Sequence, residues 1–382
     1  MTYPNVSTSD PAPDLGPLHW SPRGESPAQP VRKKHRWVAP VLLAVATLLV
    51  AGLLASSFVT IPYYAVAPGS ARRVDDLVRV SDQSKVYPHK GNVLFTTVSE
   101  YRARVIDAVH SWFDHDIQLI GEKRVLGDAQ PSQLNQINLN EMSDSKQVAV
   151  AVALRRIGAK EQGSGTLVTS VGQNVAASGH LQAGDVIMSI NGIPTPLSQN
   201  AVDVIHSLKP GDTGTLVVRG PGSAADRTET FTLGANPQTP EVAYVGVTLA
   251  TKDDRFDVPY TVTIDSGSIG GPSAGLAFTL EVIDSLTPGE LTGGNQVAVT
   301  GTIEADGSVG PIGGIAQKTA AVRAAGARYF LVPADEYDVA KAHAGSHLQV
   351  VKITTLEQAL QFLGTLGGDV TALGPPPATL RR

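Results

Sequence analysis

Residues 269–284 read IGGPSAGLAFTLEVID, and this stretch decides the fold of the C-terminal part of the chain. Pro272 suits the first position of a helix and an apolar stripe follows it, so we predict a helix over 272–287. The first N–H groups of a helix have no partner within it and can receive a developing oxyanion. Ser273 lies at this position, which makes it a candidate nucleophile. Helix starts are also common places for a serine that only caps the helix.

Lys318 is the candidate base for that nucleophile. A serine hydroxyl is a poor nucleophile unless a base takes its proton, and the motif around Ser273 contains no histidine. Lys318 lies in IAQKTAAVRAAG, residues 315–326, which predicts a second helix. Burial among its alanines would desolvate the amine, lower its pKa and leave it neutral. A single lysine on a helix is ordinarily solvated, so the prediction rests on Ser273 and Lys318 together.

Three stretches around these residues, 269–284, 291–327 and 330–336, resemble the proteolytic domain of the Lon protease family. The surrounding residues alternate between predicted strands and helices. The strands are expected over 242–251, 260–265, 329–333 and 348–353, with a hairpin over 296–314. We therefore predict an α/β (α+β) fold with mixed sheets, in which a Lon-type proteolytic domain covers 237–365.

The resemblance implies specific roles for residues of this chain. Ser273 falls on the family's catalytic serine and Lys318 on its catalytic lysine, so the resemblance implies a Ser–Lys dyad. The implied supporting residues are Thr300, which holds the lysine side chain, and Gly271, Pro272 and Ala274, which frame the nucleophile turn. Many ATP-dependent relatives carry an acidic residue where this chain has Gly270, so we expect a more open site here.

A separate unit is predicted over 145–236. It contains LQAGDVIMSINGIPT at 181–195 and KPGD at 209–212, and it resembles a PDZ domain of the bacterial protease-associated type. Such a sheet with an open edge beside a helix accepts an extended peptide as an added strand. We place the closed end of the peptide groove at Ile157, Gly158 and Ala159, where a glycine-containing loop would present N–H groups to a terminal carboxylate. The alternative is a unit that only packs against its neighbour.

The N-terminal region predicts attachment to a membrane. Residues 1–36 lack an apolar period and end in a basic cluster, so we expect a disordered cytoplasmic tail. Residues 37–59 contain no charge and are long enough for one transmembrane helix. Positive charge before the span keeps the N-terminus cytoplasmic, which places the C-terminal domains outside the cytoplasm at the cell membrane. A cleaved signal peptide is the alternative, with Ala65-Val66-Ala67 as a small-residue cleavage motif.

The extracytoplasmic region 60–144 yields no catalytic residue. A strand is predicted over 91–100 and a helix over 101–113. The strand resembles an early hairpin of the Lon proteolytic domain, so we expect the PDZ unit to be inserted into the protease domain. Four potential metal ligands crowd near a helix end and do not converge on one point, so no metal site is predicted at His110, Asp114, His115 and Asp116.

Composition and missing motifs argue against a nucleic-acid-binding protein and against other classes of enzyme. The net charge of -5 gives no basic footprint for nucleic acid, and the absence of cysteine removes disulfides and thiolate nucleophiles. No Gly-x-x-x-x-Gly-Lys-Ser/Thr loop occurs, so we expect no ATP and no other cofactor. The chain also lacks the Gly-x-Ser-Gly loop of trypsin-like enzymes and the His-Glu-x-x-His of metalloproteases.

The expected function is that of an ATP-independent serine endopeptidase that cleaves protein or peptide substrates. The alternative from another class is a catalytically inactive PDZ scaffold on a Lon-like fold, against which the presence of both Ser273 and Lys318 argues. Lon-like domains often assemble as rings, so a homo-oligomer is considered. Residues 366–382 are expected to form a flexible tail.

Overall fold

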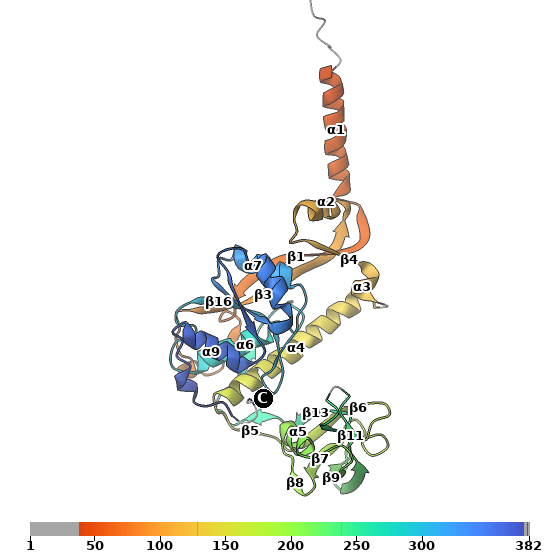
Figure 1. Ribbon diagram of the computed structural model, residues 1–382, viewed down its shortest axis with the longest axis vertical. Coiled ribbons are helices and arrows are strands. Elements are labelled where there is room, and N and C mark those ends of the chain that lie inside the picture. Colours follow the sequence, from red (N-terminus) through yellow and green to blue (C-terminus); the bar gives the residue numbers. More distant parts are fainter. Residues whose placement is uncertain (1–37, 128, 238, 378–379, 381–382) are drawn as a thin grey trace, which may run out of the picture. The chain divides into compact units, whose positions relative to one another are not determined.

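The computed structural model describes residues 38–127, 129–237, 239–377 and 380 (Figure 1). The chain separates into two compact units, Met1–Ala55 and Ser56–Arg382, which are described one at a time. The tail predicted over 1–36 lies outside the described residues.

The first unit contains helix α1 (Val38–Ser56), which has no acidic residue in its first turn and no basic residue in its last. Its large apolar side chains are exposed, among them Leu42, Leu43 and Leu48. Within the described residues, no helix combines the length and the apolar character needed to cross a membrane. The transmembrane helix expected over 37–59 is therefore not supported; the observed helix ends at Ser56 and a strand begins at Thr60.

The second unit is built around a mixed sheet whose central strand is β3. The strand order is β20-β19-β16-β3-β1-β4. Strand β3 pairs antiparallel with β1 on one side and parallel with β16 on the other. Strands from early and late parts of the chain thus share one sheet: β1 (Thr60–Arg73), β3 (Asn92–Arg104), β4 (Gln118–Gly121), β16 (Gln296–Val299), β19 (Tyr329–Pro333) and β20 (Gln349–Ile353).

Two helices cover opposite faces of this sheet. Side chains alternate between the faces of a strand, so Val93 and Phe95 join the core cluster of helix α6 (Gly275–Leu286), while Leu94 joins that of α7 (Ile315–Ala324). Every residue of α6 is buried, and it packs on the long helix α4 (Pro131–Arg156). The pairing of β3 with β16 ends at the Phe95–Val299 pair, although β3 continues to Arg104.

A second sheet lies between these strands in sequence. Its order is β10-β9-β7-β6-β13, and helix α5 (Ser198–Ser207) packs on it around a separate apolar core. Asn191 and Gly192 both have positive φ in the turn after β7. The strands are β6 (Gly165–Val171), β7 (Val186–Ile190), β9 (Thr213–Arg219), β10 (Asp226–Thr232) and β13 (Val247–Lys252).

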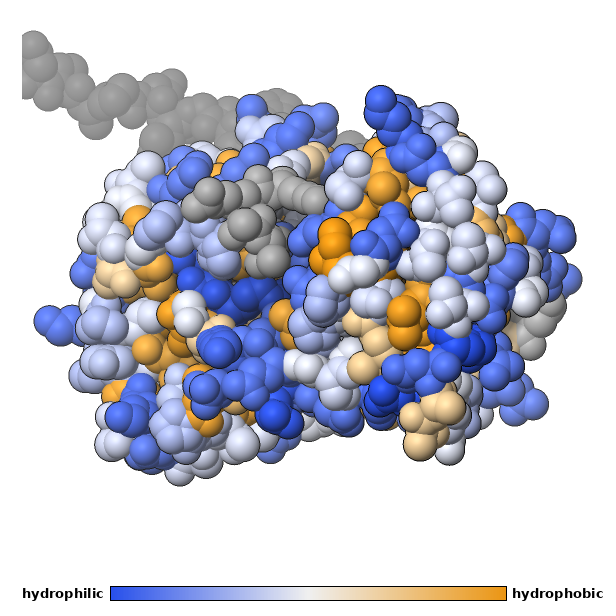
Figure 2. All heavy atoms as spheres, turned by 90° about the horizontal axis from the view of Figure 1, so that it is seen from below, coloured by the Kyte–Doolittle hydropathy of each residue, from blue (hydrophilic) through white to orange (hydrophobic). Residues whose placement is uncertain are grey.

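The remaining elements are short. Small antiparallel pairs join β2 (Val78–Val80) to β15 (Val262–Ile264), β5 (Glu161–Gln162) to β14 (Arg255–Phe256), β11 (Gly234–Ala235) to β12 (Ala243–Tyr244) and β17 (Thr302–Ile303) to β18 (Val309–Gly310). Strand β8 (Ile193–Pro194) pairs with β7, and the other helices are α2 (Val105–Phe113), α3 (Glu122–Leu126), α8 (Tyr337–His343) and α9 (Leu356–Thr365). On the face drawn in Figure 2, apolar residues form separate small patches among hydrophilic ones.

The mixed α/β fold class is confirmed, and several local expectations differ from the structure. The strand predicted over 242–251 is divided into β12 and β13, and β13 joins the second sheet. The helix predicted over 101–113 begins only at Val105, because β3 continues to Arg104. The hairpin predicted over 296–314 is divided, since β16 joins the main sheet and only β17 and β18 form a hairpin. Part of the tail expected over 366–382 is held in place, because Leu373 is buried and its carbonyl accepts a hydrogen bond from the Arg156 guanidinium at 3.0 Å.

Candidate active site

Ser273 lies at the start of α6, in a loop whose backbone is fixed by helix α4. Gly271 has a φ of 86°, a left-handed conformation that favours glycine, and its N–H donates to the Asn138 carbonyl at 2.7 Å. The Ser145 hydroxyl donates to the Pro272 carbonyl at 3.0 Å. Two successive residues of the nucleophile loop are therefore held from α4 before the chain enters α6.

The residues after β16 hold Ser273 from the other side. The Ser273 carbonyl accepts hydrogen bonds from the Gly301 N–H at 2.9 Å and from the Thr300 hydroxyl at 3.2 Å. The N–H of Leu276, in the first turn of α6, donates to the Gly301 carbonyl at 3.2 Å. The main chain at Ser273 thus has little freedom, which fixes the direction in which its hydroxyl points.

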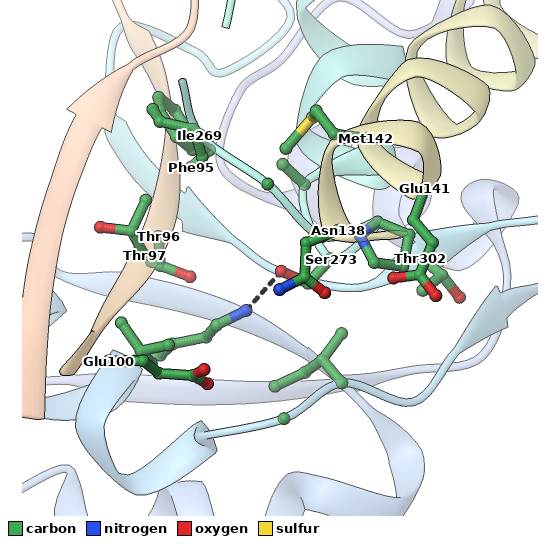
Figure 3. A pocket seen from close by; sticks show the side chains of 18 of the residues that line it. Phe95, Thr96, Thr97, Glu100, Asn138, Glu141, Met142, Ile269, Ser273 and Thr302 are labelled. Carbon is green, nitrogen blue, oxygen red and sulfur yellow. Dashed lines mark hydrogen bonds between the residues drawn. The ribbon is translucent and has the colours of Figure 1, made fainter. Parts of the chain in front are cut away.

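Lys318 reaches this hydroxyl from α7. Its Nζ lies 2.6 Å from Ser273 Oγ and 3.3 Å from Thr300 Oγ1, and the first contact is the dashed line in Figure 3. The residue is 2% exposed, because the alanine-rich helix packs closely on the sheet. The structure therefore brings together Ser273, Lys318 and Thr300, which are far apart in the sequence.

Burial favours the neutral form of the Lys318 amine. It lowers the pKa of Lys318 from its ordinary value to about 7, while the Glu336 carboxylate acts in the opposite direction. A neutral amine has one lone pair and two N–H groups. One N–H can donate to Thr300 Oγ1, so the lone pair is available to accept the Ser273 proton.

Two backbone amides beside the hydroxyl are available as donors. Among the described residues, the N–H groups of Ser273 and Ala274 have no hydrogen-bond partner, whereas that of Gly275 donates to the Pro272 carbonyl at 3.2 Å. They lie at the N-terminal end of α6, where the helix dipole favours negative charge. This end of the helix can stabilise an oxyanion formed next to Ser273.

Ser273 opens into a cleft of about 720 Å³. One wall is the nucleophile loop, 268–274, and another is the glycine-rich loop 311–313 that precedes α7. Strand β3 contributes residues 95–98 and Glu100 (Figure 3). Helix α4 contributes side chains from one of its faces, namely Asn135, Asn138, Glu141 and Met142.

The contributions of β3 and α4 to this cleft were missed in the sequence, where 60–144 was expected to carry no chemistry. A signal exists in retrospect, since Asn135, Asn138 and Met142 are spaced by three and four residues and so share one face of a helix. That spacing does not say what the face contacts, because the contact depends on how α4 packs on α6.

The predicted closed end of the PDZ groove is not formed by Ile157, Gly158 and Ala159. These residues end helix α4, and their N–H groups donate to the carbonyls of Ala153, Arg155 and Leu154 at 2.9–3.1 Å. Ile157 and Ala159 also pack against the core of the α6 cluster. The glycine was expected in a loop that presents free N–H groups to a ligand. It instead lies at the end of helix α4, which was not predicted, so these N–H groups already have partners.

Potential metal ligands are not clustered. Within the described ranges, no group of three or more His, Cys, Asp or Glu side chains is arranged to hold a metal ion. His110, Asp114, His115 and Asp116 belong to the end of α2 and the segment after it.

Comparison with known proteins places two domains on this chain. The family model described as the Lon protease (S16) C-terminal proteolytic domain matches residues 249–364, and a PDZ domain model matches residues 141–224. A Lon-type proteolytic domain and a PDZ domain are therefore present, and the first supports the assignment as a serine peptidase.

Individual relatives match only in part. The Lon protease of Phenylobacterium zucineum (strain HLK1) is 37% identical over 105 residues, which are 26% of this chain and 13% of that protein. Lon protease 1 of Sorangium cellulosum (strain So ce56) is 33% identical over 109 residues, 28% of this chain and 13% of that protein. The crystal structure of the PDZ domain of the SdrC-like protein (Lmo2051) from Listeria monocytogenes is 33% identical, with a TM-score of 0.21, and covers 22% of this chain and 87% of that chain. The chain thus matches about an eighth of the length of these two curated relatives.

Proposed function

We propose that this chain is an ATP-independent serine endopeptidase that cleaves protein substrates with a Ser273–Lys318 dyad. The observation that carries the proposal is the 2.6 Å distance from Lys318 Nζ to Ser273 Oγ, made by a lysine that is 2% exposed. A buried amine without a carboxylate in direct contact is neutral more readily than a solvated one, and a neutral amine is a base. Within the described ranges, the Ser273 and Ala274 N–H groups at the site also have no hydrogen-bond partner and can stabilise an oxyanion.

The arrangement supports a two-step acyl transfer. Ser273 Oγ forms a bond to the scissile carbonyl carbon while its proton passes to Lys318 Nζ, and the carbonyl oxygen becomes an oxyanion facing the Ser273 and Ala274 amides. When the C–N bond breaks, Lys318 returns the proton to the leaving amine and an acyl-serine remains. Water then attacks this ester with Lys318 as the base, which releases the second product and restores the hydroxyl.

The test is cleavage of an unfolded protein such as casein by the purified full chain in mild detergent, without nucleotide. We expect peptide products, and we expect kcat/KM to rise with pH around pH 7. Lys318 is inactive as a base while protonated and becomes active as it loses its proton, and the pKa of Lys318 is lowered to about 7. The measurement is the rate of product formation from pH 5 to 10, with mass spectrometry of the products.

Cleavage that requires ATP would contradict the nucleotide-independent part of this proposal. A rate that falls as pH rises through 7 would contradict the role of Lys318 as base. The alternative, an inactive PDZ scaffold, predicts no cleavage at any pH. The short, buried contact between Lys318 and Ser273 favours the enzyme over the scaffold. A scaffold does not need a buried lysine beside this serine, because a solvated lysine at the same position would leave its peptide binding unchanged.

The PDZ domain is proposed to bind protein or peptide segments by adding them as a strand to its sheet. Support comes from the architecture, since β13 is an edge strand of that sheet and helix α5 packs beside it. The domain division 60–144, 145–236 and 237–365 is proposed only with moved boundaries, because α4 crosses the first boundary and β13 belongs to the PDZ sheet. Nucleic acid and cofactors have no part in it.

We also propose that the N-terminal segment tethers the chain to the cell membrane, with residues 60 onward outside the cytoplasm. The basic cluster at 32–36 precedes an uncharged helix whose leucines are exposed. We expect the full chain to stay with membranes washed in alkaline carbonate, and a variant without residues 37–59 to be released. Release of the full chain by that wash would contradict the tether.

A further inference from the structure

Helix α4 contributes to the nucleophile loop from outside the matched proteolytic region. Residues 131–140 of this helix precede both the PDZ match, 141–224, and the Lon-type match, 249–364. Even so, the Asn138 carbonyl accepts from the Gly271 N–H at 2.7 Å. Asn138 is therefore a direct neighbour of the loop that presents Ser273.

Asn138 also occupies the space beside Gly270. A Cβ atom added at Gly270 would lie 2.9 Å from the Asn138 Cβ and 3.2 Å from its carbonyl carbon, which is closer than real Cβ contacts. The expectation of a more open site at Gly270 stays a prediction, although α4 occupies the space directly beside this residue. Because Gly270 has no side chain, Asn138 can pack directly against its main chain.

The Asn138 side chain projects into the cleft. Figure 3 shows its carboxamide and the Ser273 hydroxyl extending into the same space from different elements, α4 and the start of α6. The residue is half-buried, and among the described residues its carboxamide has no hydrogen-bond partner. A carboxamide has two N–H donors and one carbonyl acceptor, and it carries no charge that would bind a solvent ion instead.

We propose that Asn138 is a further catalytic residue, whose carboxamide N–H donates to the scissile carbonyl oxygen together with the Ser273 and Ala274 amides. This rests on the proposed protease function. A side-chain amide that contacts the developing oxyanion stabilises the transition state more than the bound substrate. Removal of the Asn138 carboxamide is therefore expected to lower kcat and to leave KM unchanged.

The test compares Asn138→Ala and Asn138→Asp in the full chain. Alanine removes the carboxamide and keeps the main-chain carbonyl that holds Gly271, whereas aspartate keeps the shape and removes the N–H donors. We expect kcat for casein or a fluorogenic peptide to fall by about 100-fold in both variants, as for other oxyanion donors, with KM changed by less than about threefold. In Asn138→Asp the added negative charge near Lys318 is expected to move the pH profile to higher pH.

The matched control is Gln136→Ala, since Gln136 is exposed on α4 and donates to Asn140 at 2.9 Å, away from the cleft. It should keep the wild-type kcat, and all three variants should keep the wild-type unfolding temperature within a few degrees. The inference is overturned if either Asn138 variant retains kcat within threefold of the wild type. Retention by Asn138→Asp alone would mean that only the shape of the side chain matters. Failure of the protease function itself is separate, because the wild type would then show no Ser273-dependent cleavage.

Discussion

Lys318→Met is expected to lower kcat for protein cleavage by about 10⁴-fold or more, and Ser273→Ala by a similar factor. Methionine has nearly the length of lysine and is apolar, so it suits a position that is 2% exposed while it removes the base. Alanine removes the only atom through which Ser273 contacts Lys318 Nζ, at 2.6 Å. Both variants should fold, because the main-chain contacts of Ser273 with Thr300 and Gly301 remain.

The double variant gives the sharper result. Two residues that act as one unit are strongly non-additive, so Ser273→Ala combined with Lys318→Met should be no slower than either single variant. The control is Lys352→Met, which changes an exposed lysine on β20 and should leave the rate within twofold. The measurement is the initial rate of casein cleavage by the wild type, the two single variants, the double variant and the control. A single variant that keeps a tenth of the wild-type rate would refute the dyad.

Glu281→Gln is expected to stabilise the fold by about 4 kcal/mol at pH 8, with little effect at pH 4.5. Glu281 lies in α6, is 0% exposed, and accepts a hydrogen bond from the Ser285 hydroxyl at 3.2 Å. Its Oε2 has no partner among the described residues, and His89 Nε2 lies 3.4 Å from its Oε1. Burial and then the neighbouring Asp284 charge raise the pKa of Glu281 to about 8.

The sign follows from proton binding. Above pH 4.5 the unfolded chain loses the Glu281 proton while the folded chain keeps it up to about pH 8, so the free energy of unfolding falls by about 1.4 kcal/mol per pH unit across this window. Glutamine is neutral at every pH and can still accept the hydrogen bond from the Ser285 hydroxyl. The free energy of unfolding of the variant therefore does not fall across this pH window. Urea unfolding at pH 4.5, 6 and 8 measures the difference.

Glu304→Gln is the control for this series, because Glu304 is exposed and its replacement should change stability by less than about 0.5 kcal/mol at each pH. If Glu281→Gln and the wild type differ by the same amount at pH 4.5 and pH 8, Glu281 does not carry a bound proton in the folded state.

The parts of the site that could be predicted are those encoded in short stretches. Ser273 and its helix follow from a glycine pair, a proline and an apolar stripe, and Lys318 from an alanine-rich helix. The role of Thr300 could be predicted only from the resemblance to the Lon family. The structure places its hydroxyl 3.3 Å from Lys318 Nζ, directly after the end of β16.

The parts that could not be predicted depend on contacts between distant residues. Nothing local in Asn138 says that its carbonyl will accept from Gly271, and the role of β3 in the cleft depends on where its pairing with β16 stops. The error at Ile157–Ala159 has the same origin. A glycine after an apolar residue fits a ligand-binding loop and a helix end equally well, and only the length of α4 decides between them.

The central place of β3 has a consequence for biosynthesis. The Gly91 N–H, just before β3, donates to the Glu290 carboxylate at 2.8 Å, and these residues are 199 positions apart in the chain. At about 5–20 residues per second, a ribosome supplies the later partner roughly 10–40 s after the earlier one. The sheet between β6 and β13 closes over shorter separations and can form on the nascent chain in the meantime. The nucleophile and its base therefore meet only after the ribosome has synthesised Lys318, long after β3.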